Sequence, residues 1–512
     1  MNGRILPQVP VMMVVLCSLM LGGCIGGRYV TPPEIAMEES LVVPDRTITD
    51  EEKQVLTVKM TDEGEEVAVF TIEQAIDRSV RYNIRMLNMY EQYRMVESDL
   101  RGAKAEFLVK YSPTITGIVA GEDDAEDRFY SVNVTKKHRL GTVGGIRVSA
   151  ESGDDEKKSA IRFSLDQPLL RGAGKLVVTN NLVNARRNIA ITLRAIEMAK
   201  EQLVFSVVSN YYEIIREKEL VSLYEKSAER MRTLLEQSRQ KQKVDLVSEA
   251  DVLRVEIQLA WAEDNLITAR QFLGDALDDL KILLGYSEVV QIDIDAGILY
   301  EEVEVDEDEA MVTALTRRID YLEARDRIRD AERNQKVARN NLLPDLDLVV
   351  GYAFSGEGTD YSEAFKYEDS SWFLGFSTTT DVRRVAERAG YARARLETQN
   401  VRRDFILLRD QILREVRQNI RNLNKNLKRI QLQRRTVEHA ENQFKLAQLR
   451  YSQNLITDIS IVTDAEDDLI LAQTNYILAV TDYIVSQARL KMALGTLTEK
   501  SPEVYAIGYF AN

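Results

Sequence analysis

Residues 259–285 read LAWAEDNLITARQFLGDALDDLKILLG and residues 469–495 read LILAQTNYILAVTDYIVSQARLKMALG, so one helical pattern recurs 210 positions downstream. Each copy carries a stripe of large apolar residues spaced seven apart, and each ends in Leu-Gly. This stripe consists of Leu259, Leu266, Leu273 and Leu280 in the first copy, and of Leu469, Tyr476, Tyr483 and Leu490 in the second. A second stripe, rich in small residues, keeps the same spacing: Ala262, Ala269, Ala276 and Leu283 match Ala472, Ala479, Ser486 and Ala493. The duplication predicts long helices that need partners, within the chain or from other copies, to build a core.

The amino terminus has the pattern of a secretory signal. One early cation, Arg4, precedes an apolar run from Val11 to Leu21, which is too short for a permanent membrane helix. Leu21-Gly22-Gly23-Cys24 resembles a bacterial lipobox, so we expect residues 1–23 to be removed and Cys24 to carry lipid. An incidental thiol is the alternative for Cys24. In lipoproteins of this kind, Ile25 in place of Asp implies sorting to the outer membrane.

The composition argues against several classes of function. A formal net charge of −15 disfavours nucleic-acid binding. The chain has two histidines, His138 and His439, and neither has a Cys or His neighbour at ligand spacing. We therefore expect no metal site, no cofactor and no enzyme activity.

The remaining chain divides into two similar units. We expect a mainly α fold with a small β part, in which helix, strand pair and long helical hairpin occur twice. The expected segments are an extended arm (24–69), a first unit (70–300) with strands at about 112–167 and a hairpin at about 176–285, an acidic linker (301–310), a second unit (311–497) with strands at about 345–378 and a hairpin at about 385–495, and a tail (498–512).

The predicted strands alternate apolar and polar residues. Ile161, Phe163 and Leu165, for example, alternate with polar neighbours that include Arg162 and Asp166. We expect about four such strands per chain, although extra alternation near Tyr130 leaves the number in the first unit open. If the strands cross lipid, their edges must be closed, and four strands are too few for a barrel. Two or three copies would then have to share one barrel. The alternative is an ordinary small sheet packed on helices.

Five segments together resemble the TolC-type outer-membrane efflux protein family. They are FTIEQAIDRSVRYN from Phe70, DQPLLRGAG from Asp166, SEADVLRVEIQLAWAEDNL from Ser248, ARNNLLPDLDLVVGY from Ala338 and TDAEDDLILAQTNYILAVTDYIVSQARLKMALGTL from Thr463. The resemblance implies a homotrimer with a twelve-stranded transmembrane β-barrel and a trimeric α-helical barrel in the periplasm. It also implies a passive exit duct for small molecules or proteins, in a tripartite efflux or type I secretion system. The implied partners are outer-membrane lipid, a periplasmic adaptor (membrane fusion protein) and an inner-membrane pump of the RND or ABC type.

Two groups of site residues follow from the resemblance. The adaptor would bind the helix tips, which here are Asp245, Leu246, Val247 and Ser248 in the first unit and Leu455, Ile456, Thr457 and Asp458 in the second. Ser248 and Asp458 can each cap the following helix. A ring of carboxylates would line the periplasmic aperture, with Asp464, Asp467 and Asp468 as candidates. The alternative for these acids is a favourable interaction with the helix dipole, which applies most strongly to Asp467 and Asp468.

Two rival functions would share some of these features. A lipid-anchored periplasmic coiled-coil scaffold or adaptor would have the lipobox and the helices, but not alternating strands in both units. A lipoprotein hydrolase would need a nucleophile and a base in the stretch from Ser112 to Pro168, where His138 is the one imidazole.

Overall fold

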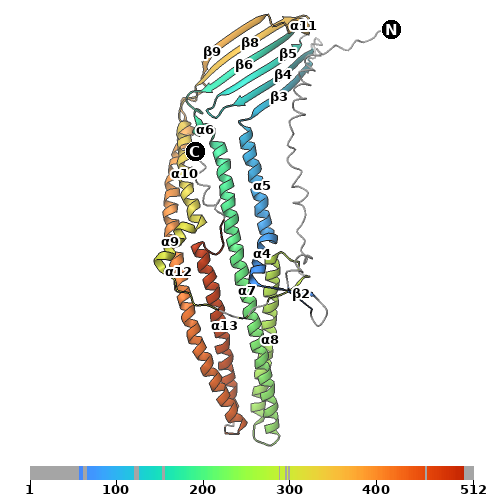
Figure 1. The fold of residues 1–512 in the computed structure, drawn as a ribbon, viewed down its shortest axis with the longest axis vertical. Helices are drawn as coiled ribbons and strands as arrows, with labels where there is room; N and C mark the ends of the chain where they lie inside the picture. Colours follow the sequence, from blue (N-terminus) through green and yellow to red (C-terminus); the bar gives the residue numbers. More distant parts are fainter. Residues whose placement is uncertain are drawn as a thin grey trace, which may run out of the picture.

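The structure, a computed structural model, describes residues 57–60, 66–119, 126–152, 156–287, 289–294, 297, 300–455 and 458–500. The expected signal peptide, Cys24, most of the arm and residues 501–512 lie outside this range. Within it the fold is mainly helical with a smaller β part, as expected. The chain forms an elongated body, with a large sheet at one end and the turns of two helical hairpins at the other (Figure 1).

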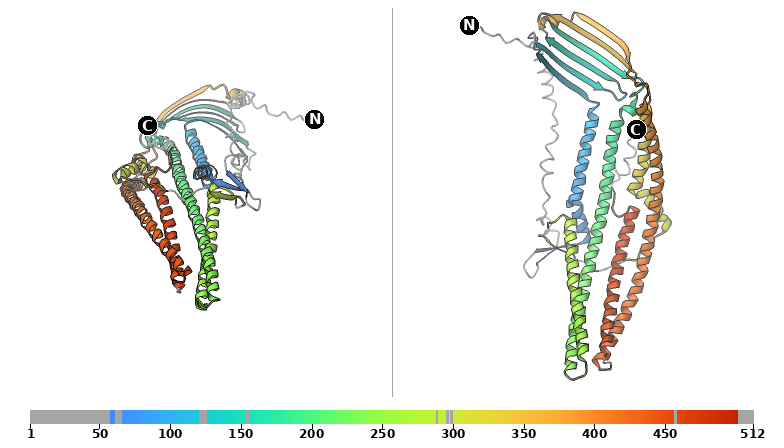
Figure 2. Two further views of the ribbon diagram at one scale, coloured as in Figure 1. Left: turned by 60° about the horizontal axis from the view of Figure 1, so that its bottom comes forward. Right: turned by 180° about the vertical axis from the view of Figure 1, so that it is seen from behind.

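The four longer helices of each half correspond, whereas the short helices α6 and α11 occupy different places in the chain order. The first half contains α4 (Ile72–Tyr82), α5 (Ile84–Ala105), a short α6 (Lys175–Val178), α7 (Asn180–Gln242) and α8 (Glu249–Leu284). The second half contains α9 (Glu307–Arg317), α10 (Ile319–Asn340), a short α11 (Tyr361–Ala364), α12 (Val385–Ser452) and α13 (Ser460–Leu494). With 63 residues, α7 extends about 95 Å at 1.5 Å per residue. The two views of Figure 2 show α7 beside α8 and α12 beside α13 along the lower part of the body.

The helical stretch that precedes the strands is broken once in each unit, between α4 and α5 and between α9 and α10. The breaks fall at Asn83 and Arg318, whose backbones are extended. Asn83 caps α5 by accepting the backbone N–H of Arg85 at 2.9 Å, and its side-chain amide donates to the carbonyl of Leu283 at 3.0 Å. Apolar periodicity continues through both breaks, which is why the sequence pattern did not reveal them.

A small sheet lies near the middle of the body. It consists of β1 (Thr57–Met60), β2 (Glu66–Phe70) and β7 (Gln291–Ile294), in that order, with β2 parallel to β7. The strand β1 and most of β2 belong to the segment expected to be an extended arm, residues 24–69. Phe70 and Ile292 join Tyr211 of α7 and Leu280 of α8 in one buried apolar cluster.

The large sheet has six strands, which corrects the expectation of about four. These are β3 (Val109–Val119), β4 (Glu126–Lys137), β5 (Val143–Ser152), β6 (Lys157–Pro168), β8 (Asp347–Gly358) and β9 (Asp369–Ser377), and all neighbours in this order are antiparallel. The first unit thus supplies four strands and the second unit the expected pair. Three copies of this sheet would not give a twelve-stranded barrel, because twelve strands from three chains require four each.

The helical hairpins pack against each other near their turns. One buried cluster contains residues of all four long helices, including Val255 of α8, Tyr451 of α12 and Val462 of α13. By length and composition α13 could cross a membrane, but it packs against α7, α8, α9 and α12 along the helical body. We therefore assign α13 to the core of the helical part.

The candidate channel wall, neck and helix tips

The two faces of the six-stranded sheet differ sharply in polarity. The paired residues on one face are mainly apolar; two of its rows are Tyr111, Val134, Ile146, Phe163, Tyr352 and Trp372, and Pro113, Val132, Val148, Ile161, Phe354 and Ser370. The other face is mainly polar; two of its rows are Ser112, Asn133, Arg147, Arg162, Ala353 and Ser371, and Thr114, Ser131, Ser149, Ala160, Ser355 and Asp369. We call these the apolar face and the polar face. Strands of 9–12 residues with this alternation have the length and pattern of transmembrane β-strands.

Side-chain exposure supports a membrane for one face and water for the other. On the apolar face, Ile115 is 78% exposed and Trp372 is 74% exposed, which a chain in water would avoid. On the polar face, Arg147 and Arg162 lie directly opposite each other on β5 and β6. Like charges in that position are destabilising unless water screens them. This arrangement fits a sheet between lipid and an aqueous lumen.

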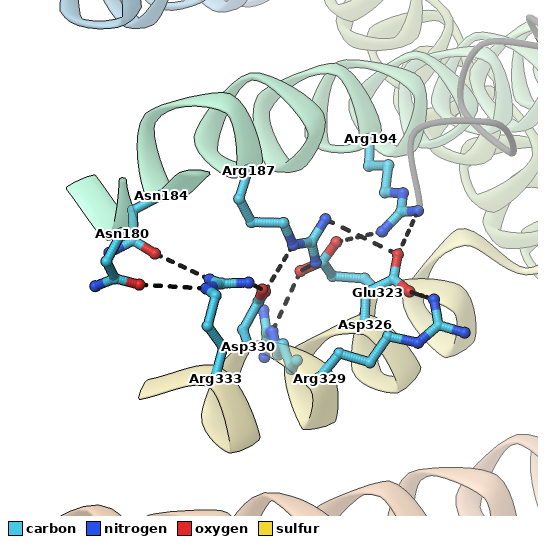
Figure 3. A network of polar contacts seen from close by, with 10 residues as sticks. Asn180, Asn184, Arg187, Arg194, Glu323, Asp326, Arg329, Asp330 and Arg333 are labelled. Carbon is cyan, nitrogen blue, oxygen red and sulfur yellow. Dashed lines mark hydrogen bonds and ion pairs between the residues drawn. The ribbon is translucent and has the colours of Figure 1, made fainter. Parts of the chain in front are cut away.

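A charged network, which we call the neck, joins α7 of the first unit to α10 of the second (Figure 3). Arg194 of α7 is 2% exposed and donates to Glu323 at 2.7 Å and to Asp326 at 2.8 Å, both on α10. About two helical turns before it, Arg187 donates to Asp330 at 2.7 Å and to Glu323 at 2.5 Å. Neighbouring contacts come from Arg329, Arg333, Asn180 and Asn184. The neck therefore fixes the first long helix of one unit against the second helix of the other.

The two tips differ in backbone register. In the first tip Asp245 takes the left-handed conformation, with φ 57°, whereas in the second tip Asn454 takes it, with φ 60°. At the repeat spacing of 210, the counterpart of Asp245 is Leu455. The left-handed residue is instead Asn454, one position earlier, and Leu455 does not have a positive φ. Asp and Asn tolerate this conformation better than other residues with side chains. Neither tip sequence, 243–248 or 453–458, contains a glycine.

Both expected capping residues accept backbone N–H groups. Ser248 accepts from Asp251 at 3.2 Å and begins α8. Asp458 accepts from Ser460 at 2.9 Å, although the residue directly before α13 is Ile459 and not Asp458. Hydrogen bonds from the side chain and the backbone of Ser460 lower the pKa of the Asp458 carboxyl. Leu246 and Leu455 are exposed and Val247 is buried, while Ile456 and Thr457 lie outside the described residues.

Polar contacts join the two hairpins above the tips. Glu466 of α13 is 2% exposed and receives two hydrogen bonds from Arg230 Nε, at 3.0 and 2.9 Å, and one from Arg230 Nη2 at 2.7 Å. Ser227 adds a fourth hydrogen bond at 2.8 Å. Closer to the tips, the hydroxyl groups of Ser238 and Tyr451 are 3.0 Å apart. We call the contact between Arg230 and Glu466 the hairpin clasp.

The three candidate aperture acids lie on the exposed side of α13. Asp464 is exposed, Asp467 accepts a hydrogen bond from Gln258 of α8 at 3.0 Å, and Asp468 accepts one from Gln443 of α12 at 3.4 Å. Although Asp467 is exposed as a residue, its carboxylate sits between α8 and α13, and the loss of solvent there raises its pKa. The neighbouring charge of Asp464 raises it further. Asp464 is thus the most accessible of the three acids for a ring formed with other copies of the chain, whereas the carboxylates of Asp467 and Asp468 accept hydrogen bonds from their own chain.

The neck and the hairpin clasp were not predicted from the sequence. The role of Glu466 has no signal in the nearby sequence, because its partner Arg230 lies 236 positions away. The sequence around either residue does not distinguish a buried ion pair from exposed charges, because the same helices also carry charged residues on their outer sides. In the part of the chain that the structure describes, no group of three or more His, Cys, Asp or Glu residues could hold a metal ion.

Residues 310–496 match the family model described as outer membrane efflux protein. The chain is 23% identical over 326 residues to outer membrane protein TolC of Escherichia coli strain K12, an alignment that covers 59% of this chain and 63% of that protein. It is 23% identical over 314 residues to outer membrane protein TolC of Vibrio cholerae, which covers 59% of this chain and 69% of that protein. The chain thus spans somewhat less than two thirds of the length of the Escherichia coli relative.

Solved channels have the same fold. The Campylobacter jejuni CmeC outer membrane channel superposes with a TM-score of 0.65 at 14% identity, over 86% of this chain and 89% of that chain. The open state of the Neisseria gonorrhoeae MtrE outer membrane channel superposes with a TM-score of 0.63 at 16% identity, over 83% and 89% of the two chains. CmeC and MtrE are both outer membrane channels.

Proposed function

We propose that this chain is the outer-membrane exit duct of an export system. Two findings support the proposal: residues 310–496 match the outer membrane efflux protein family, and the fold is that of TolC-like channels. The observation that carries the proposal is the six-stranded sheet with one continuous apolar face, set on helices of about 95 Å. A scaffold that stays in the periplasm has no use for such a face, because it would expose large apolar side chains to water.

The duct would be passive. Energy would come from a pump in the inner membrane, as the resemblance to the TolC-type family implies. The helix tips, Asp245 to Ser248 and Leu455 to Asp458, would contact a periplasmic adaptor. The exported substrate would be a small molecule or a protein, in a tripartite efflux or type I secretion system. The resemblance to TolC-like proteins supports these roles.

A homotrimer is the assembly that we propose. Its support is the family resemblance together with the open edges of the sheet, since unpaired backbone groups are not tolerated in hydrocarbon. In a trimer Asp464 from three chains would approach one axis and form an aperture ring that attracts cations. Lipid on Cys24 would add an anchor, although a single acyl chain binds a membrane weakly and the barrel would hold the protein in place.

Fractionation and native mass measurement test this proposal. Full-length protein expressed in a Gram-negative host should sediment with the outer membrane and resist extraction by high salt. After detergent extraction, its native mass should correspond to three chains. A monomer released by high salt would refute the proposal and favour the lipid-anchored scaffold.

A further inference from the structure

The first unit contains one strand hairpin more than the second. The start of α10 follows the start of α5 by 235 residues, whereas the end of α12 follows the end of α7 by only 210. The first unit is therefore 25 residues longer between these points. The second unit connects α10 to α12 through β8 and β9, and the first connects α5 to α7 through β3, β4, β5 and β6. The chain thus provides its own two-strand reference, against which β4 and β5 are the additional pair.

The additional hairpin is anchored at its lower end. Lys137, at the end of β4, donates to Glu106 below β3 at 2.7 Å, and this hydrogen bond lowers the pKa of the glutamate. In the turn between β4 and β5, the carbonyl of Leu140 accepts from Gly174 at 3.2 Å. Gly141 has φ +107°, and a Cβ there would lie 2.7 Å from Cγ of Pro168. The turn is therefore fitted to its surroundings, and it holds β4 and β5 in the plane of the wall.

The six strands also span the same arc as the helices below them. The helices that adjoin the sheet lie in the order α5, α7, α10 and α12 (Figure 1). At 8–10 Å between axes, four helices span about 36 Å. Strands spaced by about 4.8 Å and tilted by about 40° each take about 6 Å of circumference, so six span about 38 Å and four only about 25 Å. A wall with six strands per chain therefore continues the helical wall without narrowing.

The outer strands have compatible edges. The strand β3 leads upward from α5 and β9 leads downward into α12, so β9 of one copy would pair antiparallel with β3 of the next. Exposed apolar residues of both strands, such as Ile115 on β3 and Trp372 on β9, belong to the same face of the sheet. Joining these edges would continue the apolar face from one copy to the next and pair the open backbone groups.

We propose that β9 of each copy pairs with β3 of its neighbour, so that the trimer closes a barrel of eighteen strands rather than twelve. This inference rests on the proposed trimeric channel and specifies its wall. Barrels of sixteen to eighteen strands enclose an aqueous channel. The barrel is then wide at the exit, and the narrow point of the duct lies at the helix tips, where the aperture acids and the adaptor-binding turns are found.

Disulfide trapping across the seam tests the strand number. Ser371→Cys on β9 is combined in turn with Ser112→Cys, Thr114→Cys or Thr116→Cys on β3, all on the polar face, in the full chain in outer membranes. The parallel variant combines Ser371→Cys with Ser149→Cys on β5, and Ser371→Cys alone is the background. The natural cysteines, Cys17 and Cys24, lie far from these positions in the sequence.

Eighteen strands predict oxidised dimers and trimers, visible without reductant on denaturing gels, from at least one β3 combination and from neither control. Crosslinking through Ser149→Cys instead would overturn the proposal, because it would place β5 at the seam and leave twelve strands, while the proposed function would stand. Oligomers that stop at two copies would overturn the eighteen-stranded trimer in favour of a two-copy barrel. A monomer with no crosslink from any pair would overturn both proposals.

Discussion

Replacing Arg194 with Met should destabilise the neck strongly, because the side chain is 2% exposed and holds two acids of α10. The substitution keeps most of the apolar stem but removes hydrogen bonds of 2.7 Å to Glu323 and 2.8 Å to Asp326. Removing one partner of a buried ion pair costs about 3–5 kcal/mol. Arg187 still reaches Glu323 and Arg329 still reaches Asp326, so we expect the lower end, about 3 kcal/mol.

The matched control is Arg402→Met. Arg402 of α12 also pairs with an acid of α10, Glu332, at 2.7 Å, but the two side chains are 59% and 41% exposed. An exposed pair of this kind contributes about 0–1 kcal/mol. Adding Asp326→Asn to Arg194→Met should cost less than the sum of the single changes, since the stranded carboxylate is then neutral.

Urea denaturation of the detergent-solubilised full chain, followed by helical circular dichroism, measures these differences. At an unchanged slope, the midpoint should fall clearly for Arg194→Met and hardly at all for Arg402→Met. Equal shifts for the two variants would refute the reasoning, because they would show that burial of the neck does not determine its contribution.

The other predictions concern the lower part of the helical body and the amino terminus. Arg230→Met leaves the buried carboxylate of Glu466 without its cation and should lower the free energy of unfolding by about 3 kcal/mol. Arg232→Met, which removes an exposed pair with Glu263, should have little effect. The same urea titration measures both changes. The raised pKa of Asp467 means that ionisation of its carboxyl group destabilises the fold. Asp467→Asn should therefore stabilise the protein at neutral pH, and this gain in stability should vanish at acidic pH, where the carboxyl group is protonated in both the folded and the unfolded state. The pKa of Asp458 is lowered, so Asp458→Asn should destabilise the protein at neutral pH, and this loss should vanish in acid. Unfolding midpoints measured at pH 7 and pH 3 test both variants. If both variants shift the midpoint in the same direction at pH 7, the two pKa directions are contradicted. Asp464→Ala should reduce the cation selectivity of the channel in reversal-potential measurements, and unchanged selectivity would remove Asp464 from the aperture. Cys24→Ser should abolish incorporation of labelled palmitate, and retained label would refute the lipobox interpretation.

The long helices could be predicted closely, because their apolar stripes are local in sequence. The first hairpin, expected at about 176–285, is formed by α7 and α8, and Gly285 ends α8 with φ 79°. A capping box of Thr71 and Gln74 begins α4. Such features depend on neighbours three to seven positions apart, which a sequence displays directly.

The number of strands and the contacts between units could not be predicted in the same way. Alternation near Tyr130 and Val132 was visible, but whether such a stretch joins a sheet depends on partners such as Val148 on β5. The tip register is similar: the left-handed residue is Asn454 rather than Leu455, because a side chain that tolerates this backbone was available one position earlier. The neck joins residues 129 and more positions apart, as between Arg194 and Glu323.

Ion conductance tests the central claim most directly, namely that copies of this chain close their sheets into a transmembrane channel. Purified full-length protein, added to one side of a planar lipid bilayer, should insert and produce discrete, reproducible conductance steps. Protein oxidised through the β3 and β9 cysteines should retain these steps, because the trapped seam is part of the native wall. Absence of conductance from protein that is folded and trimeric would contradict the account.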